Sequence, residues 1–160
     1  MVIIRFFEEK DADSVISVAR KAWHHTYAHI FSKERIEEYI GKHYNSKTLI
    51  PGNSVRNAFW VAEETGKIIG FAQIGLLGEE MHLWRIYLDP SFIGKGIGSK
   101  LLKTVESFMK EQGIQKYRLE VHQKNKLGLS FYERKGFKVI ETAGESCNSD
   151  CEIVMEKELN

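Results

Sequence analysis

Residues 83–102, LWRIYLDPSFIGKGIGSKLL, decide the fold of this chain. An apolar run ends at Leu88, a turn signal follows at Asp89 and Pro90, and the glycine-rich stretch 94–98 comes next. Apolar residues then recur at helical spacing, which predicts a helix with one buried face: Ile97, Leu101, Leu102, Val105, Phe108 and Met109. A glycine loop that opens a helix presents backbone N–H groups and the positive end of the helix dipole, an arrangement that favours phosphate.

The elements after this loop predict two parallel strands in one sheet. Gly113 is placed to end the helix, and Tyr117 to His122 reads as the next strand, so residues 83–121 form a βαβ unit. The loop is no P-loop, because a GKS or GKT ending is missing, and its glycine spacing does not fit the dinucleotide fingerprint. A tight turn without any ligand is the alternative interpretation.

The rest of the chain predicts one α/β domain over residues 1–160 with a mixed central sheet. Val2 to Phe6 reads as a strand, Asp11 or Asp13 as the start of a helix, and Ser32 as the start of a second helix. Three strands are predicted at residues 59–63, 68–75 and 81–88, and a further helix at residues 126–134. A strand pair, residues 137–142 and 152–157, ends the predicted order. The expected order is β-α-α-β-β-β-α-β-α-β-β.

The composition excludes several classes of protein. The 160 residues are 42% hydrophobic and 28% charged, as in globular domains. Lys and Arg number 23 against 22 Asp and Glu, a net charge of +1, which gives no global attraction to nucleic acid or to a membrane surface. The apolar run at the N-terminus is too short for a signal peptide, so we expect a cytoplasmic protein. Free thiols are therefore favoured for Cys147 and Cys151, with a disulfide within the chain or between subunits as the alternatives. Whether two copies form a homodimer is left open.

Two sequence blocks carry a resemblance to a known family. The run YLDPSFIGKGIGSKLL, residues 87–102, resembles the acetyl-CoA signature Q/R-x-x-G-x-G/A of the GNAT superfamily of N-acetyltransferases. The run NKLGLSFYERKGF, residues 125–137, is similar to that family's N-x-x-A-x-x-F-Y-x-x-x-G-F segment, with Gly128 in place of alanine. The resemblance covers nearly the whole chain and implies transfer of acetyl from acetyl-CoA to a primary amine in a ternary complex, without a metal.

The resemblance also implies which residues bind acetyl-CoA. Ile93 stands where the family has Gln or Arg, so a side-chain contact with the pyrophosphate is lost and anchoring relies on the backbone. The expected binding residues are Ile86, Tyr87, Leu88, Ile93, Gly94, Lys95, Gly96, Ile97, Gly98, Ser99, Asn125 and Lys126. For the lysines the alternative is an ordinary surface charge, and for Asn125 it is a simple helix cap.

The resemblance implies catalytic roles as well. The N–H of Leu88 is the candidate donor to the thioester oxygen, and Tyr132 is the candidate general acid for the thiolate, with a packed core aromatic as the alternative. An amine with a pKa near 10 is about one part in a thousand neutral at pH 7, so a proton must be removed. Glu80 and His82 share one face of the preceding strand and are the candidates, a structural role being the alternative.

The identity of the acceptor amine is the feature that the sequence specifies least. The stretch from Trp23 to Tyr27 resembles an aromatic-x-x-Thr-aromatic segment of PaiA-type polyamine acetyltransferases, which also share Arg-Ile-Tyr at residues 85–87. Spermidine or spermine is therefore the expected acceptor, with Trp23, Tyr27, Glu34 and Trp84 as binding residues. The alternatives are an acetyltransferase for protein N-termini or lysines, and a non-catalytic acyl-CoA-binding module. His25 and His29 lack a third metal ligand.

Overall fold

A computed structural model describes residues 1–142, 144, 147 and 151–160 of the chain. In these residues one mixed sheet has the strand order β1-β3-β4-β5-β6-β8-β7, with β2 paired to β3. All neighbouring strands are antiparallel except β5 and β6, which are parallel as expected. The strands are β1 (Val2–Phe6), β2 (Asn53–Ser54), β3 (Asn57–Glu64), β4 (Lys67–Leu77), β5 (Glu80–Leu88), β6 (Lys116–His122), β7 (Lys138–Glu141) and β8 (Glu152–Glu158).

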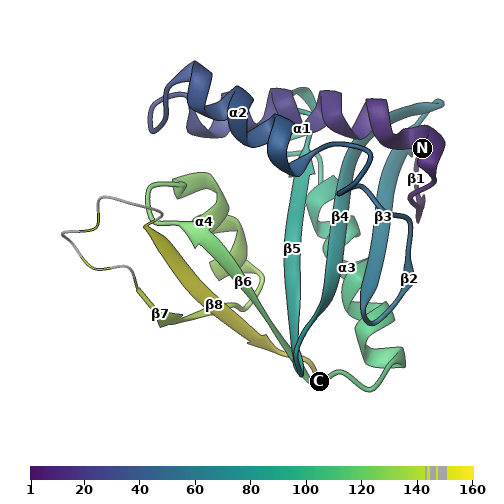
Figure 1. The fold of residues 1–160 in the computed structure, drawn as a ribbon. Helices are drawn as coiled ribbons and strands as arrows, with labels where there is room; N and C mark the ends of the chain where they lie inside the picture. Colours follow the sequence, from purple (N-terminus) through teal and green to yellow (C-terminus); the bar gives the residue numbers. More distant parts are fainter. Residues whose placement is uncertain (143, 145–146, 148–150) are drawn as a thin grey trace.

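Helices cover both faces of the sheet (Figure 1). Two lie on one face, α1 (Ala12–Tyr27) and α2 (Lys33–His43), and two on the other, α3 (Ile97–Glu111) and α4 (Lys126–Arg134). Short 3₁₀ turns, η1 (Glu9–Asp11) and η2 (Pro90–Phe92), precede α1 and follow β5. Alternate residues of the strands enter opposite cores, for example Trp60 on the α3 side and Phe59 on the α1 side. The predicted order is confirmed, and the described residues add to it the two-residue β2 and the two 3₁₀ turns.

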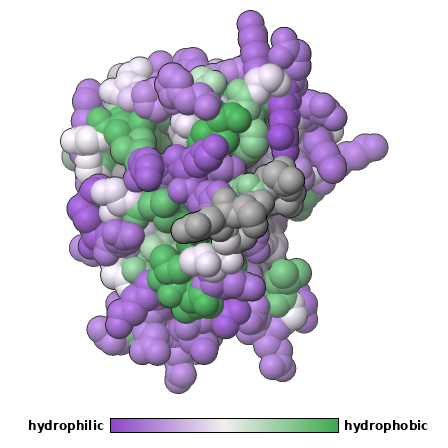
Figure 2. Space-filling model, turned by 90° about the vertical axis from the view of Figure 1, so that its left-hand side faces the viewer, coloured by the Kyte–Doolittle hydropathy of each residue, from purple (hydrophilic) through white to green (hydrophobic). Residues whose placement is uncertain are grey.

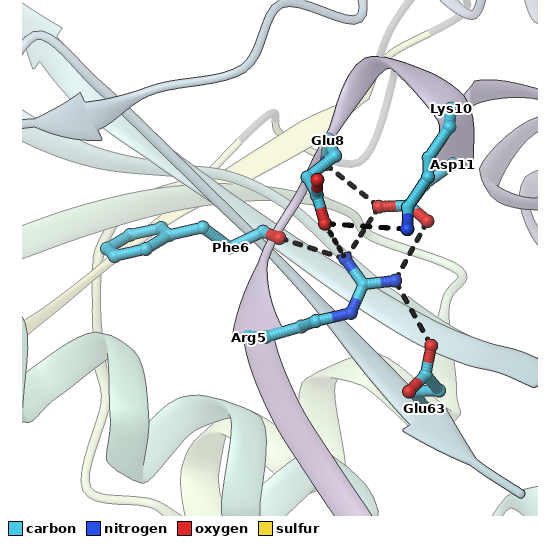
Figure 3. Close-up of polar contacts among 6 residues, drawn as sticks. All are labelled: Arg5, Phe6, Glu8, Lys10, Asp11 and Glu63. Carbon is cyan, nitrogen blue, oxygen red and sulfur yellow. Dashed lines mark hydrogen bonds and ion pairs between the residues drawn. The ribbon is translucent and has the colours of Figure 1, made fainter. Parts of the chain in front are cut away.

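The start of the chain is fixed by an ion-pair cluster rather than by a helix cap (Figure 3). Arg5 donates to both oxygens of Asp11 at 2.8 and 2.9 Å and to Glu63 of β3 at 3.1 Å. Asp11 precedes α1, but its side chain accepts from the N–H of Glu8 and makes no cap hydrogen bond to that helix. The pKa of Asp11 is lowered, first by the hydrogen bond from Arg5. Ser32, by contrast, caps α2 as expected.

The sheet opens between its two parallel strands. Among the described residues these strands pair only at His82 of β5 and Arg118 of β6, near the start of each strand, and Figure 1 shows the two strands diverging toward their ends. On the other side of β5 the register with β4 shifts, because Gln73 faces Arg85 whereas Ile74 faces Leu83. Trp84 is thus the extra residue of a β-bulge, a feature that bends a strand and re-aims its side chains.

The expectation of two free thiols is wrong for this structure, which joins Cys147 and Cys151 by a disulfide. Their Cα atoms lie 5.5 Å apart, the usual separation for a bridged pair. Cys151, the residue before β8, has a φ of +54°, and it is separated from Cys147 by four positions in the sequence. Composition and expected location favoured free thiols, because they carry no information on how close the two cysteines lie in the fold.

The surface on the side of the molecule where β7 and β8 lie is mixed in character. Figure 2 shows this side, where apolar side chains form separate patches between hydrophilic ones. Across the part of the chain that the structure describes, no helix is long and apolar enough to cross a membrane.

Candidate active site

The glycine loop leaves room for a ligand at the start of α3. Gly94 and Gly96 have φ values of +86° and +81°, a backbone conformation that residues with a Cβ rarely adopt. A methyl group built on either residue meets no heavy atom within 4 Å, so open space lies against both. Gly96 is the N-cap of α3, whose first backbone N–H groups have no helical partner. The loop therefore fits a bound pyrophosphate held by backbone amides.

A cavity of about 460 Å³ extends from this loop between β5, β6 and α4, and we call it the cofactor cavity. It includes nine of the twelve residues expected to bind acetyl-CoA: Ile86, Tyr87, Leu88, Ile93, Gly94, Gly96, Gly98, Ser99 and Asn125. The other three, Lys95, Ile97 and Lys126, do not line it. Lys95 lies 5.1 Å from the Phe92 ring, Ile97 is buried in the core, and Lys126 is exposed. Arg134, which the sequence offered as a possible cation for the cofactor phosphates, also lines the cavity, whereas Thr26 and Phe131 were missed.

A second cavity of about 340 Å³ lies on the α1 and α2 side, and we call it the acceptor cavity. Aromatic residues form much of its wall: Trp23, Tyr27, Phe31, Tyr39, Trp84 and Tyr87. Its charged and titratable residues are Arg35, His82, Glu120, His122 and Glu152. Three of the four residues expected to bind the acceptor therefore line it, and Glu34 does not. The neighbouring Arg35 occupies the face of α2 that reaches the cavity.

The two cavities meet in the gap between the parallel strands. Tyr27 of α1, Tyr87 of β5 and Glu120 of β6 line both cavities. The hydroxyl of Tyr27 accepts a hydrogen bond from Nδ2 of Asn125 at 3.3 Å and also interacts with Tyr87. Burial raises the pKa of Tyr27 and, more strongly, that of Tyr87. Both remain neutral at physiological pH, so the carboxylate of Glu120 is the charged group at this junction.

Glu120 is a further site residue that the sequence reasoning missed. It is exposed, and the residue opposite it on β8 is the apolar Val154, whereas the neighbouring Arg118 pairs with Glu156 at 2.8 Å. No hydrogen bond or ion pair joins the Glu120 side chain to another described residue. The signal in the sequence was an acidic residue in the middle of the strand KYRLEVH, which by alternation alone looks like an ordinary solvent-facing position.

The two predicted bases lie beside this junction rather than in it. His82 lines the acceptor cavity, but its Nε2 is covered and lies 3.5 Å from a carboxylate oxygen of Glu80, too far for a good hydrogen bond. Glu80 lines neither cavity and pairs with Arg118 at 2.9 Å. The predicted shared face of these two residues on β5 agrees with this geometry.

Tyr132 lines the cofactor cavity from α4, as expected for a group near the sulfur. Burial raises its pKa, and the nearby Tyr27 raises it further. The hydroxyl therefore stays protonated and can donate a hydrogen bond. Asn125, at the start of the same helix, caps it by accepting from the N–H of Gly128 at 2.9 Å. The cap interpretation of Asn125 is thus confirmed, and the residue also lines the cavity.

The α2 wall of the acceptor cavity is anchored by Arg85. Its Nε donates to Gln73 at 2.8 Å, and its Nη1 donates to the carbonyl oxygen of His43, the last residue of α2, at 2.9 Å. The guanidinium also lies 4.4 Å from the ring centroid of Tyr44. Arg85 thus ties the end of α2 to the centre of the sheet. A search of the described residues found no cluster of three or more metal-ligating side chains.

Comparison with known proteins agrees with this geometry. Residues 15–137 match the model of the acetyltransferase (GNAT) family. A spermidine N(1)-acetyltransferase of Thermoplasma acidophilum is 37% identical over 160 residues, covering 96% of this chain and 95% of that protein. A crystal structure of the PaiA N-acetyltransferase of the same organism, in complex with coenzyme A, superimposes with a TM-score of 0.86 at 35% identity, covering 99% of each chain.

A more distant relative acts on protein. The peptidyl-lysine N-acetyltransferase YiaC of Escherichia coli is 34% identical over 84 residues, which cover 52% of this chain and 52% of that protein. The match to the family model and the full-length relative together decide the assignment. The chain belongs to the GNAT family and is an acetyl-CoA-dependent N-acetyltransferase.

Proposed function

We propose that this protein transfers acetyl from acetyl-CoA in the cofactor cavity directly to a primary amine of a polyamine in the acceptor cavity. The observation that carries the proposal is the junction of the two cavities, where Glu120 stands as a carboxylate with no cationic partner among the described residues. An ammonium group is the natural partner for such a carboxylate, and the adjoining cavity is where an acyl donor would lie.

The cofactor cavity supplies binding and charge stabilisation. Backbone N–H groups at Gly96 and Gly98 would hold the pyrophosphate, in the open space that the loop leaves. Leu88 lies at the end of β5 in the same cavity, and its N–H is our candidate donor to the thioester oxygen as negative charge develops there. Tyr132 would donate a hydrogen bond, and then a proton, to the thiolate as the carbon–sulfur bond breaks.

We assign proton removal to Glu120. Attack requires a neutral amine, and the ammonium form dominates at neutral pH by about a thousandfold. Glu120 lines both cavities, so it can accept the proton directly or through one water at the place where the nitrogen approaches the thioester. In this assignment His82 is a wall residue of the acceptor cavity, and its Nε2 is directed toward Glu80.

The walls of the acceptor cavity favour a flexible polycation. Aromatic faces attract ammonium groups and also pack against methylene segments. Glu152, on β8, adds a second carboxylate to the wall that carries Glu120. A chain of ammonium groups joined by methylenes meets both kinds of contact, and the full-length relative named for spermidine supports the same acceptor class.

Steady-state assays of CoA release with a panel of acceptors test this function. We expect the highest kcat/KM for spermidine or spermine, ahead of amino acids, aminoglycosides and peptides, and we expect salt to raise KM for the polyamine more than for acetyl-CoA. A peptide amine preferred by tenfold or more would favour protein acetylation instead. Binding of acetyl-CoA without turnover of any amine would favour a non-catalytic module. A cytoplasmic location and the extent of the domain, residues 1–160, remain predictions from the sequence.

A further inference from the structure

We propose that Trp84 limits the acceptors to unbranched amines, and that Gly75 positions its indole for this role. This inference rests on the proposed function and refines its substrate class. Trp84 lines the acceptor cavity although 45% of its surface is exposed, so it forms part of the wall without being locked into the core.

The β-bulge on β5 places this side chain. In a regular strand Trp84 and Arg85 would point to opposite faces. The register shift lets Arg85 reach the end of α2 while Trp84, the residue before it, lines a cavity on the same side of the sheet. The bulge therefore adds one bulky aromatic to this wall without displacing the anchor of α2.

The indole rests on a residue that has no side chain. A methyl group built on Gly75 of β4 would overlap the six-membered ring of Trp84 and the carbonyl oxygen of Arg56. Gly75 therefore lets the indole lie against the neighbouring strand. Any side chain at this position would push the ring away from β4, and the cavity beside it would change shape.

The consequence is a steric filter. A straight methylene chain can pass along the face of the indole, whereas methyl branches on the chain one carbon away from the amine-bearing carbon would meet it. We therefore expect the enzyme to act on diaminopropane and to discriminate against its 2,2-dimethyl derivative. This pair carries the same charge and differs only in two methyl groups, so charge recognition by Glu120 and Glu152 affects both amines equally.

Kinetics with this matched pair test the filter. In Trp84→Ala, the ratio of kcat/KM for the dimethyl amine to that for the linear amine should rise by roughly tenfold or more, while the Kd for CoA stays unchanged. Leu77→Ala is the control, since Leu77 is 66% exposed on β4 and lines neither cavity. A ratio that Trp84→Ala leaves at the wild-type value, or that Leu77→Ala raises equally, overturns the proposal.

A double-variant cycle tests the role of Gly75. Gly75→Ala should raise KM for diaminopropane several-fold in the wild-type background and much less in the Trp84→Ala background, because the displaced ring is then absent. An equal rise in both backgrounds would place the effect in the strand backbone and refute the positioning role. Wild-type protein that acetylates neither spermidine nor any other amine would instead refute the proposed function, so the two failures are distinguishable.

Discussion

Removal of the Arg85 side chain should loosen the acceptor cavity while sparing the cofactor cavity. Arg85→Ala deletes two short hydrogen bonds from a charged donor, to Gln73 and to the carbonyl oxygen of His43, together with the contact on the Tyr44 ring. At about 1.5 kcal/mol for each bond and about 0.5–1 kcal/mol for the ring contact, the loss is about 3–4 kcal/mol. The bond to Thr48, at 3.4 Å, is too long to add much.

Thermal unfolding and ligand binding measure the two parts of this prediction. For a chain of this size, about 2–4 °C per kcal/mol converts the loss into a decrease in Tm of about 10 °C. KM for the amine should rise several-fold because Ile36 and Tyr39 of α2 line the acceptor cavity, and the Kd for CoA should not change because neither α2 nor Arg85 lines the cofactor cavity. Arg85→Lys keeps the positive charge but not the several N–H donors of the guanidinium, so its decrease in Tm should be about half as large. A wild-type Tm in Arg85→Ala, or equal changes in both ligand constants, would refute the anchoring argument.

Three further predictions follow. Tyr132→Phe should lower kcat by roughly ten- to ten-thousand-fold with little change in the Kd for CoA; wild-type turnover would reduce Tyr132 to a packing residue. Asn125→Ala should lower the free energy of unfolding by about 1 kcal/mol in urea, since it removes the side-chain acceptor for the N–H of Gly128 at the start of α4; unchanged stability would exclude this cap as a contributor. Arg5→Gln should destabilise the protein at pH 7, and because the pKa of Asp11 is lowered from 3.8, the difference from wild type in urea unfolding should shrink as the pH falls below that value; a difference independent of pH would exclude the Arg5–Asp11 pair as its source.

The order of elements was predictable because each one carries its own pattern. The buried side of α3 repeats every three to four residues, and α4 begins and ends where Asn125 and Gly136 indicate. The glycine loop was recognisable because only glycine adopts the conformation of Gly94 and Gly96 at low cost. These signals are local, and short segments are enough to read them.

The site was less predictable where it depends on tertiary geometry. Alternation along β6 presents Glu120 as a solvent-facing residue, and its position between two cavities arises only because β5 and β6 diverge. Both Gly96 and Ile97 were expected to bind the cofactor because both belong to the glycine loop. Only Gly96 of these two lines the cofactor cavity, whereas the side chain of Ile97 packs in the core. The bulge at Trp84 breaks the alternation that strand prediction assumes.

Initial-velocity kinetics with acetyl-CoA and spermidine both varied test the central claim most directly, which is that acetyl passes straight from one cavity to the amine in the other. A ternary complex predicts double-reciprocal lines that intersect, with acetylspermidine and free CoA formed in equal amounts by mass spectrometry. Parallel lines, with an acetylated enzyme detected when acetyl-CoA is added alone, would show a covalent intermediate and contradict direct transfer through the gap between β5 and β6.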